Sequence, residues 1–241
     1  MRRICIIILI FFPFVCFAQG QITRPVKKQQ QTEVNNTKDQ ETPKKKTQSA
    51  PKTSKSEPQK PTQGFINGHE WVDLGLPSGT KWATCNIGAW TPTSRGGYFA
   101  WGYAEYSNKN GLWNNSVEYL RSMRIINSNN VLTKTHDAAS VNWGGTWRMP
   151  TKVEFEELKS ECTWTWIDYG EHKGYKVIGP NGEYIYFPAA GRSDIETKSS
   201  GYYWSATKEE NSVFILLFSD SGIQVCRQYM KMNISVRPVT D

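Results

Sequence analysis

A helical pattern of apolar and polar positions stands out in one part of the chain. Thr151 and Glu154 have the spacing of a capping box, in which each side chain accepts a backbone N–H of the first helical turn. Pro150 comes just before this pair, where it cannot belong to the helix interior. The pattern predicts a helix over residues 152–162 with an apolar face made of Phe155, Leu158 and Cys162.

Most of the remaining apolar pattern has the period of β-strands. Strands are predicted at His69–Leu74, Lys81–Ile87, Gly97–Tyr103, Trp164–Tyr169, Tyr175–Ile178, Tyr184–Phe187, Tyr202–Ser205, Val213–Phe218, Ile223–Tyr229 and Ile234–Val236. Val213–Phe218 is apolar at every position and is therefore expected to be a central strand covered on both faces. A second short helix is expected at Thr135–Val141, and residues 105–132 are expected to form a long irregular loop that can include a short helical turn. Two short helices among many strands indicate an α+β fold.

The N-terminal region divides into two segments ahead of a single folded domain. Residues 1–18 read as a secretory signal peptide, with a retained membrane anchor or a lipidated Cys16 as the weaker alternatives. Residues 19–64 contain no aromatic residue and are rich in Gln, Lys, Thr and Pro, which predicts a disordered linker. Residues 65–241 are long enough to form one domain with its own core. The protein is thus expected to be exported to the periplasm, the outer surface or the medium.

The net charge of +7 belongs mainly to the linker. Residues 21–64 carry ten basic and four acidic residues, whereas residues 65–241 carry 17 basic and 18 acidic residues. A nucleic-acid-binding domain should hold its basic residues on the folded surface, so no nucleic-acid partner is predicted. The linker either touches anionic envelope polymers or is a solvated, self-repelling spacer.

The residues that commonly carry catalysis are scattered along the sequence. Three histidines, at positions 69, 136 and 172, have no second ligand at metal-site spacing, so neither a metal nor a cofactor is predicted. Several glutamates between 154 and 161 resemble the paired carboxylates of glycosidases, but all of them would lie on the solvent-exposed face of one helix. No phosphate-binding glycine loop is present. The sequence therefore favours a protein that is not an enzyme.

Several motifs together resemble a known family. They are Trp71-Val-Asp-Leu-Gly-Leu-Pro-Ser-Gly-Thr-Lys-Trp-Ala-Thr-Cys85, Gly97-Tyr-Phe-Ala-Trp-Gly102, Asp137-Ala-Ala139, Trp143-Gly-Gly-Thr-Trp-Arg-Met-Pro-Thr-Lys-Val-Glu-Phe-Glu156 and Ser235-Val-Arg-Pro-Val239. In this order they resemble the Fibrobacter succinogenes major paralogous domain of surface and secreted Bacteroidetes proteins, and more distantly the formylglycine-generating enzymes. The resemblance covers residues 65–241. It implies a single C-type-lectin-like domain of the formylglycine-generating type, with no established activity.

The resemblance also suggests a disulfide and a ligand-binding face. Cys85 and Cys162 lie in matching segments and form the preferred disulfide, which leaves Cys226 as a buried thiol. Cys226 is the only late cysteine, and its surroundings do not resemble the active-site motif of formylglycine-generating enzymes, so their activity is not transferred. By resemblance the C-terminal region is the exposed ligand face of this fold. The candidate binding residues are Tyr202, Tyr203, Gln224, Arg227, Tyr229 and Lys231.

Three classes of function remain open on these grounds. The first is a non-catalytic recognition domain that binds a glycan or a protein through the C-terminal face. The second is a structural or assembly component of the cell envelope, and the third is an enzyme acting on glycan or thiol. Aromatic residues suit both sugar stacking and protein interfaces. Five tryptophans in the matching segments, at positions 71, 82, 101, 143 and 147, are instead expected in the core.

Overall fold

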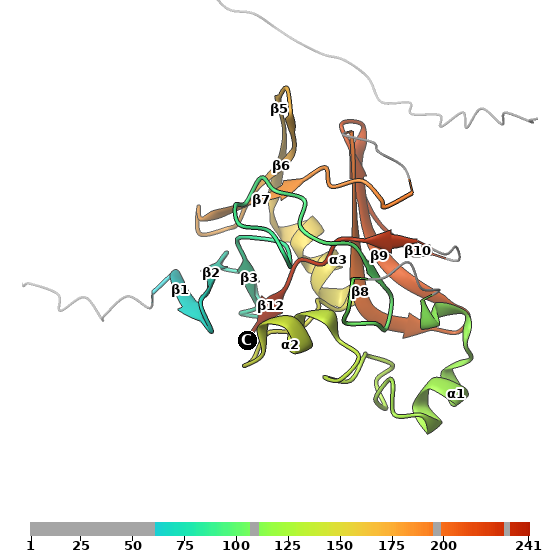
Figure 1. The fold of residues 1–241 in the computed structure, drawn as a ribbon. Coiled ribbons are helices and arrows are strands. Elements are labelled where there is room, and N and C mark those ends of the chain that lie inside the picture. The colour runs from blue at the N-terminus through green and yellow to red at the C-terminus, as the bar shows by residue number, and fades with distance from the viewer. Residues whose placement is uncertain (1–60, 107–110, 195–198, 229–231) are drawn as a thin grey trace, which may run out of the picture. The chain divides into compact units, whose positions relative to one another are not determined.

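The structure, a computed structural model, describes residues 61–106, 111–194, 199–228 and 232–241 (Figure 1). These ranges are mostly antiparallel β-sheet with a few short helices, which confirms the predicted α+β class. In this part of the chain, no helix is both long and apolar enough to cross a membrane. The predicted signal peptide and most of the predicted linker lie outside the described residues.

The strands pair in four groups. The first is a four-stranded sheet in the order β1 (Gln63–Ile66), β2 (His69–Asp73), β3 (Lys81–Ala83) and β12 (Val239–Thr240). The second is β5 (Thr163–Tyr169), β6 (His172–Ile178) and β7 (Tyr184–Pro188). The third is β10 (Gly222–Gln228), β9 (Ser212–Ser219) and β8 (Ser200–Glu209), and β4 (Phe99–Ala100) pairs with β11 (Asn233–Ile234).

Three α-helices and one short 3-10 helix are found in the described ranges. They are η1 (Leu112–Asn114), α1 (Val117–Ser122), α2 (Ala138–Trp143) and α3 (Lys152–Glu161). The capping box of Thr151 and Glu154 is present at α3, which confirms the predicted start of that helix. The predicted loop of residues 105–132 contains the short helical turn that the sequence allowed, as α1, where Ser116 accepts the Tyr119 N–H and Leu120 is buried.

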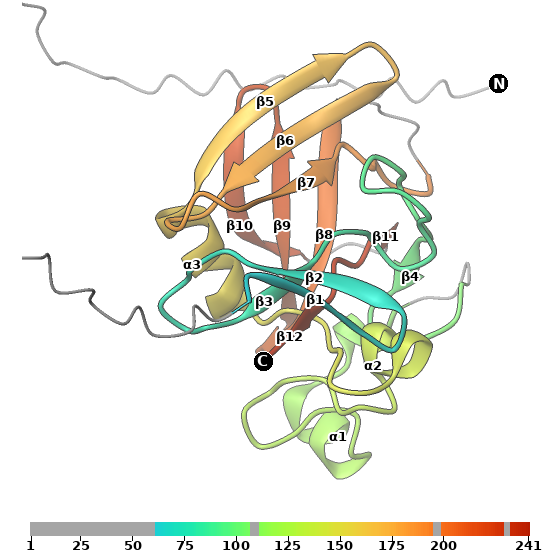
Figure 2. The same cartoon turned by 90° about the vertical axis from the view of Figure 1, so that its left-hand side faces the viewer.

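The central sheet consists of β8, β9 and β10, and helix α3 lies against it (Figures 1 and 2). Residues alternate along β9, so Ile215 packs into one apolar cluster while Leu216 and Phe218 pack into another on the opposite face. Helix α3 covers the second face with Phe155 and Leu158, both fully buried. The predicted central strand, apolar on both faces, is therefore confirmed.

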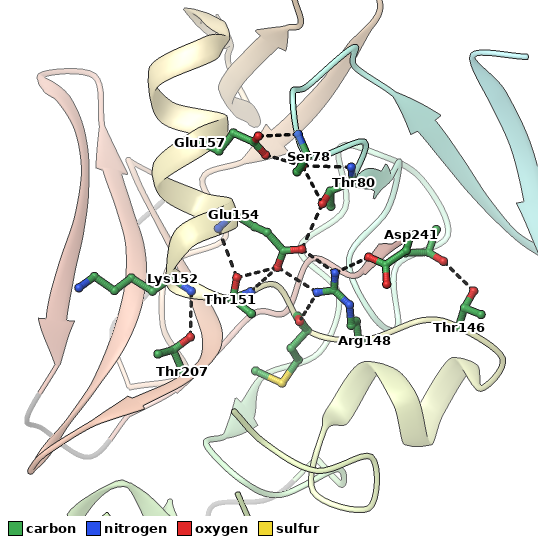
Figure 3. Close-up of polar contacts among 12 residues, drawn as sticks. Ser78, Thr80, Thr146, Arg148, Thr151, Lys152, Glu154, Glu157, Thr207 and Asp241 are labelled. Carbon is green, nitrogen blue, oxygen red and sulfur yellow. Dashed lines mark hydrogen bonds and ion pairs between the residues drawn. The ribbon is translucent and has the colours of Figure 1, made fainter. Parts of the chain in front are cut away.

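An ion pair joins the start of α3 to the C-terminal strand (Figure 3). The Arg148 guanidinium donates to both carboxylate oxygens of Glu154, at 2.9 and 2.6 Å, and to Asp241 at 2.6 Å. Arg148 also exchanges two backbone hydrogen bonds with Val239 in β12. A second carboxylate of α3, that of Glu157, accepts from the backbone N–H and the hydroxyl of Ser78. Segments far apart in the sequence thus meet at the N-terminal half of one helix.

Two predicted strands are shorter than expected. β3 ends at Ala83, although the pattern predicts a strand to Ile87, and β4 has two residues. The guanidinium of Arg237 donates to the carbonyls of Ala83 and Thr84 at 2.9 and 2.8 Å. These carbonyls are satisfied by a side chain, so the chain leaves the sheet at this point without unpaired polar groups.

The folded part begins before the predicted boundary at residues 64 and 65. Gln63 and Gly64 lie in β1, which pairs with β2 across an Asn67-Gly68 turn. Thr62 accepts the Asp73 N–H and donates to Glu183 at 2.8 Å. The first four described residues therefore belong to the domain.

The contribution of β1 to the stability of the domain can be measured by truncation. A chain that begins at Pro61 should melt at the same temperature as one that begins at residue 19, whereas a chain that begins at Asn67 should melt several degrees lower, because it lacks β1 and its hydrogen bonds. A loss of about 1 kcal/mol shifts the midpoint by roughly 2–4 °C in a domain of this size. Thermal unfolding followed by circular dichroism checks this. Equal midpoints for the two shorter chains would show that β1 does not stabilise the domain.

The ion pair of Arg148 and Glu154 predicts a pH dependence of stability. Burial favours the neutral form of Glu154, but the hydrogen bond and charge of Arg148, together with hydrogen bonds from Thr151, lower its pKa below the ordinary value of 4.5. The unfolded state then binds more protons just below pH 4.5, so the stabilisation is complete above this pH and is lost as the pH falls. Glu154→Gln should therefore cost about 1.5–3 kcal/mol at neutral pH, the usual range for a hydrogen bond to a charged group.

The check is chemical denaturation of both proteins between pH 3 and pH 7. The difference in free energy of unfolding should shrink as the pH falls through 4.5. Glu156→Gln is the matched control, because Glu156 lies on the same helix, is exposed and makes only a long ion pair of 4.0 Å with Lys152. This substitution should change the free energy of unfolding by less than about 0.5 kcal/mol. A difference that stays constant over the pH range would contradict this role of Glu154.

Candidate functional site: an aromatic groove

The residues predicted to form one C-terminal face lie on two sides of the central sheet. Tyr202 in β8 and Gln224 in β10 both lie opposite Leu217 of β9, so the three share one face. They line a cavity of about 430 Å³ together with Ser200, Ser219 and Ser221. The structure therefore brings Tyr202 and Gln224 together at a shallow polar site.

The other predicted residues do not join them. Tyr203 is fully buried, and its hydroxyl donates to the Pro188 carbonyl at 2.6 Å, so its prediction as an exposed binding residue is wrong. Arg227 lies opposite Phe214 on the α3 side of the sheet and pairs with Glu209 at 2.7 Å. Successive residues of a strand point to opposite faces, and Gln224 and Arg227 are separated by an odd number of positions. Tyr229 and Lys231 lie outside the described residues.

The predicted disulfide between Cys85 and Cys162 is not formed. Both residues, and Cys226, are half-buried free thiols. Burial, together with the charges of Glu157 and Glu161, raises the pKa of Cys162 to about 12, and burial raises the pKa of Cys226 as well. Cys162 packs beside the apolar cluster under α3, whereas Cys85 lines a groove on another part of the surface.

This groove has a volume of about 560 Å³, which exceeds the 430 Å³ of the cavity near Gln224. Three strongly exposed aromatic side chains line it: Phe65 at 71%, Trp90 at 97% and Tyr106 at 57% of their full exposure. Trp143 and His69 form a stacked pair in its lining, with ring centroids 3.8 Å apart and planes 5° from parallel. Exposed aromatic rings gathered around one hollow indicate a binding surface.

The hairpin of β1 and β2 places Phe65 and Glu70 at the groove. Asn67 and Gly68 both have positive φ, as a two-residue type I′ turn requires. The turn is fixed to the end of α2, because the Asn67 amide donates to the Trp143 carbonyl at 3.0 Å. The Trp147 indole N–H also donates to the Ile66 carbonyl at 2.9 Å. The tryptophans around the two glycines at 144 and 145 thus hold the hairpin that carries four groove residues.

The segment from Asn86 to Gly97 places Trp90 and supports Tyr106. The Gly97 N–H donates to the Ile87 carbonyl, and the Asn86 amide donates to the Arg95 carbonyl, both at 2.9 Å. A Cβ atom added at Gly97 would lie 1.5 Å from the Tyr106 ring, so only glycine lets that ring lie against the backbone. Trp90 is therefore exposed on a segment that is closed by its own hydrogen bonds.

A buried guanidinium fixes the rear of the groove. Arg237 is fully buried and donates to the Asn86 side chain at 2.8 Å, in addition to the carbonyls of Ala83 and Thr84. A further N–H reaches the Tyr186 carbonyl at 2.9 Å, and the guanidinium lies over the Phe187 ring. Carbonyl and amide acceptors thus replace water around the charge, and the backbone leading to Cys85 is held in place.

Aromatic and other apolar side chains make up most of the groove lining. Burial lowers the pKa of His69, which keeps the ring neutral at pH 7. Among the described residues, His69 makes no hydrogen bond to Cys85 or Glu70, so no nucleophile is paired with a base there. No group of three or more His, Cys, Asp or Glu side chains in the described ranges is placed to hold a metal ion.

Sequence reasoning missed this site for identifiable reasons. Its aromatic residues come from four separate segments, and Trp90 lies in a stretch without strand or helix periodicity. The Asn67-Gly68 pair is a strong hairpin signal and could have revealed β1. Of the five tryptophans expected in the core, Trp71 is only half-buried, and Trp143 is buried yet lines the groove.

Comparison with known proteins gives no match to a family model, to a curated protein or to a solved structure. The geometry of the groove therefore carries the functional inference.

The free thiols lead to a prediction about reactivity. Thiolate is the reacting form, so Cys162, with its pKa near 12, should be alkylated slowly in the folded protein, whereas Cys85 should react fastest because it lines an open groove. Iodoacetamide labelling followed by peptide mass spectrometry measures the three rates, and the unfolded protein is the control in which all three should react alike. Recovery of a linked Cys85–Cys162 peptide from exported protein would contradict this prediction.

Proposed function

We propose that this protein is an exported, non-catalytic recognition module that binds a glycan in the aromatic groove. The observation that carries the proposal is the set of three exposed rings, Phe65, Trp90 and Tyr106, around one cavity of about 560 Å³. An aromatic ring offers a large apolar face to the apolar side of a sugar, and polar groups beside the ring can bind the hydroxyl groups of the sugar. No ring contact joins these three side chains among the described residues, so they are separate platforms along the groove.

The exposure of the rings supports binding over a structural role within this domain. An indole that is almost wholly exposed contributes little to folding, yet the segment that carries Trp90 is held by backbone hydrogen bonds. A backbone that is already held in place loses little conformational freedom on binding, which favours affinity. Trp90 is accordingly the expected anchor of the interaction.

Family membership and export are part of the same proposal. The motifs of residues 71–102, 137–156 and 235–239 support membership of the major paralogous domain family and a C-type-lectin-like fold. The apolar N-terminal segment supports export, which would place the groove where envelope and extracellular glycans occur. The linker would hold the domain at a distance from whatever lies at its N-terminus.

Binding of the mature chain, residues 19–241, to a glycan array tests the proposal. Trp90→Ala and Phe65→Ala should each weaken binding at least tenfold, or about 1.4 kcal/mol, and leave the melting temperature nearly unchanged because both side chains are exposed. Tyr169→Ala is the matched control, since Tyr169 is 75% exposed on the hairpin of β5 and β6 and does not line the groove.

Tyr202→Ala separates the groove from the shallow cavity near Gln224. Loss of binding in this variant, with full binding by Trp90→Ala, would move the site to the C-terminal cavity and overturn the groove as the binding surface. Binding of no glycan, combined with a Trp90-dependent complex with an envelope protein, would overturn the glycan and favour an assembly role.

A further inference from the structure

We propose that the groove selects uncharged sugar chains over acidic ones and that Glu70 determines this selectivity. This inference rests on the proposed glycan-binding function and adds the class of ligand. Its physical basis is the charge and the unused hydrogen-bonding capacity of the side chains that line the groove.

Glu70 is the only charged residue among the described lining residues. The nearby His69 ring is stacked on Trp143 and is partly removed from water, which disfavours its cationic form. The described part of the groove therefore offers no cation to an acidic sugar. A ligand carboxylate or sulfate would instead meet the Glu70 charge in a surface where aromatic rings exclude part of the water, and like charges repel there more strongly than in bulk water.

The Glu70 carboxylate has no hydrogen bond or ion pair within the described residues. Its backbone is nevertheless fixed, because the Glu70 carbonyl accepts the Thr84 N–H at 3.2 Å. Phe65 lies directly opposite Glu70 in the pairing of β1 with β2, so the ring and the carboxylate stand side by side on one face of the hairpin. A sugar stacked on the ring would bring its hydroxyl groups within reach of the two carboxylate oxygens.

Asn142 adds a second hydrogen-bond acceptor. Its amide nitrogen donates to the carbonyls of Ala104 and Ala138, both at 2.8 Å, which uses both amide hydrogens. The remaining oxygen of this exposed side chain is free to accept. The groove thus presents acceptors at Glu70 and Asn142, and the matching ligand is rich in hydroxyl donors.

Affinity electrophoresis of the mature chain tests the selectivity. The gels contain either a neutral polymer (galactomannan, xyloglucan or arabinoxylan) or an acidic polymer (polygalacturonate or chondroitin sulfate). Each variant is run in two forms, one with Trp90 intact and one that also carries Trp90→Ala. Only the retardation that Trp90→Ala removes is assigned to the groove. This control is needed because the basic linker can retard the protein in acidic polymers without using the groove.

The expected result is groove-dependent retardation by at least one neutral polymer and by neither acidic polymer. Glu70→Gln, which keeps the shape but loses the charge, should weaken neutral binding by roughly tenfold, because a charged acceptor is replaced by a neutral one. Glu70→Lys should abolish neutral binding and produce groove-dependent retardation by an acidic polymer. Unchanged neutral binding by Glu70→Gln would show that Glu70 does not determine selectivity.

Different results would overturn the selectivity for uncharged sugars and the glycan binding itself. Groove-dependent binding of the wild-type chain to an acidic polymer, as strong as to any neutral one, would overturn the inference and leave glycan binding intact. Absence of groove-dependent retardation in all five polymers would overturn the proposed function, and the inference with it.

Discussion

The contact between Arg148 and Glu154 is the constraint on which the arrangement of the domain depends. Glu154 closes the capping box of α3, pairs with Arg148 and accepts from Thr80, so one carboxylate links the helix start, the turn before β3 and the segment that follows α2 (Figure 3). A partly buried ion pair loses solvation, and its net contribution to stability is modest unless all its hydrogen bonds are made. The Glu154 carboxylate accepts hydrogen bonds from the helix start, from the turn before β3 and from the segment that follows α2. These bonds together fix the position of the three segments relative to one another.

The same arrangement determines where the groove lies. The segment between Trp143 and Trp147 precedes Arg148 and holds the tip of the hairpin of β1 and β2, while Arg237 holds the backbone behind Cys85. Buried polar side chains therefore support the walls, and exposed rings provide the surface. A binding site whose walls are already held needs little rearrangement when a ligand enters.

Local sequence patterns predicted the elements whose cause is local. The capping box predicted α3, and the apolar run predicted β9 as a covered strand. The early end of β3 depends on a distant partner, Arg237, which no pattern in that segment reveals. The groove likewise combines residues from segments far apart in the sequence. The predicted C-terminal face failed for a different reason, because assigning residues to a face requires the two-residue alternation of strands, which separates Gln224 from Arg227.

The position of β12 has a consequence for how the chain acquires its structure. β12 pairs with β3, exchanges hydrogen bonds with Arg148 and brings Asp241 to the guanidinium, so the first sheet and the start of α3 are incomplete until residue 241 has been synthesised. Pairings between residues so distant in sequence are slow to form, because the intervening chain must first be ordered. A growing chain that lacks its last residues would therefore be missing one edge strand of the first sheet and one acceptor of the Arg148 guanidinium.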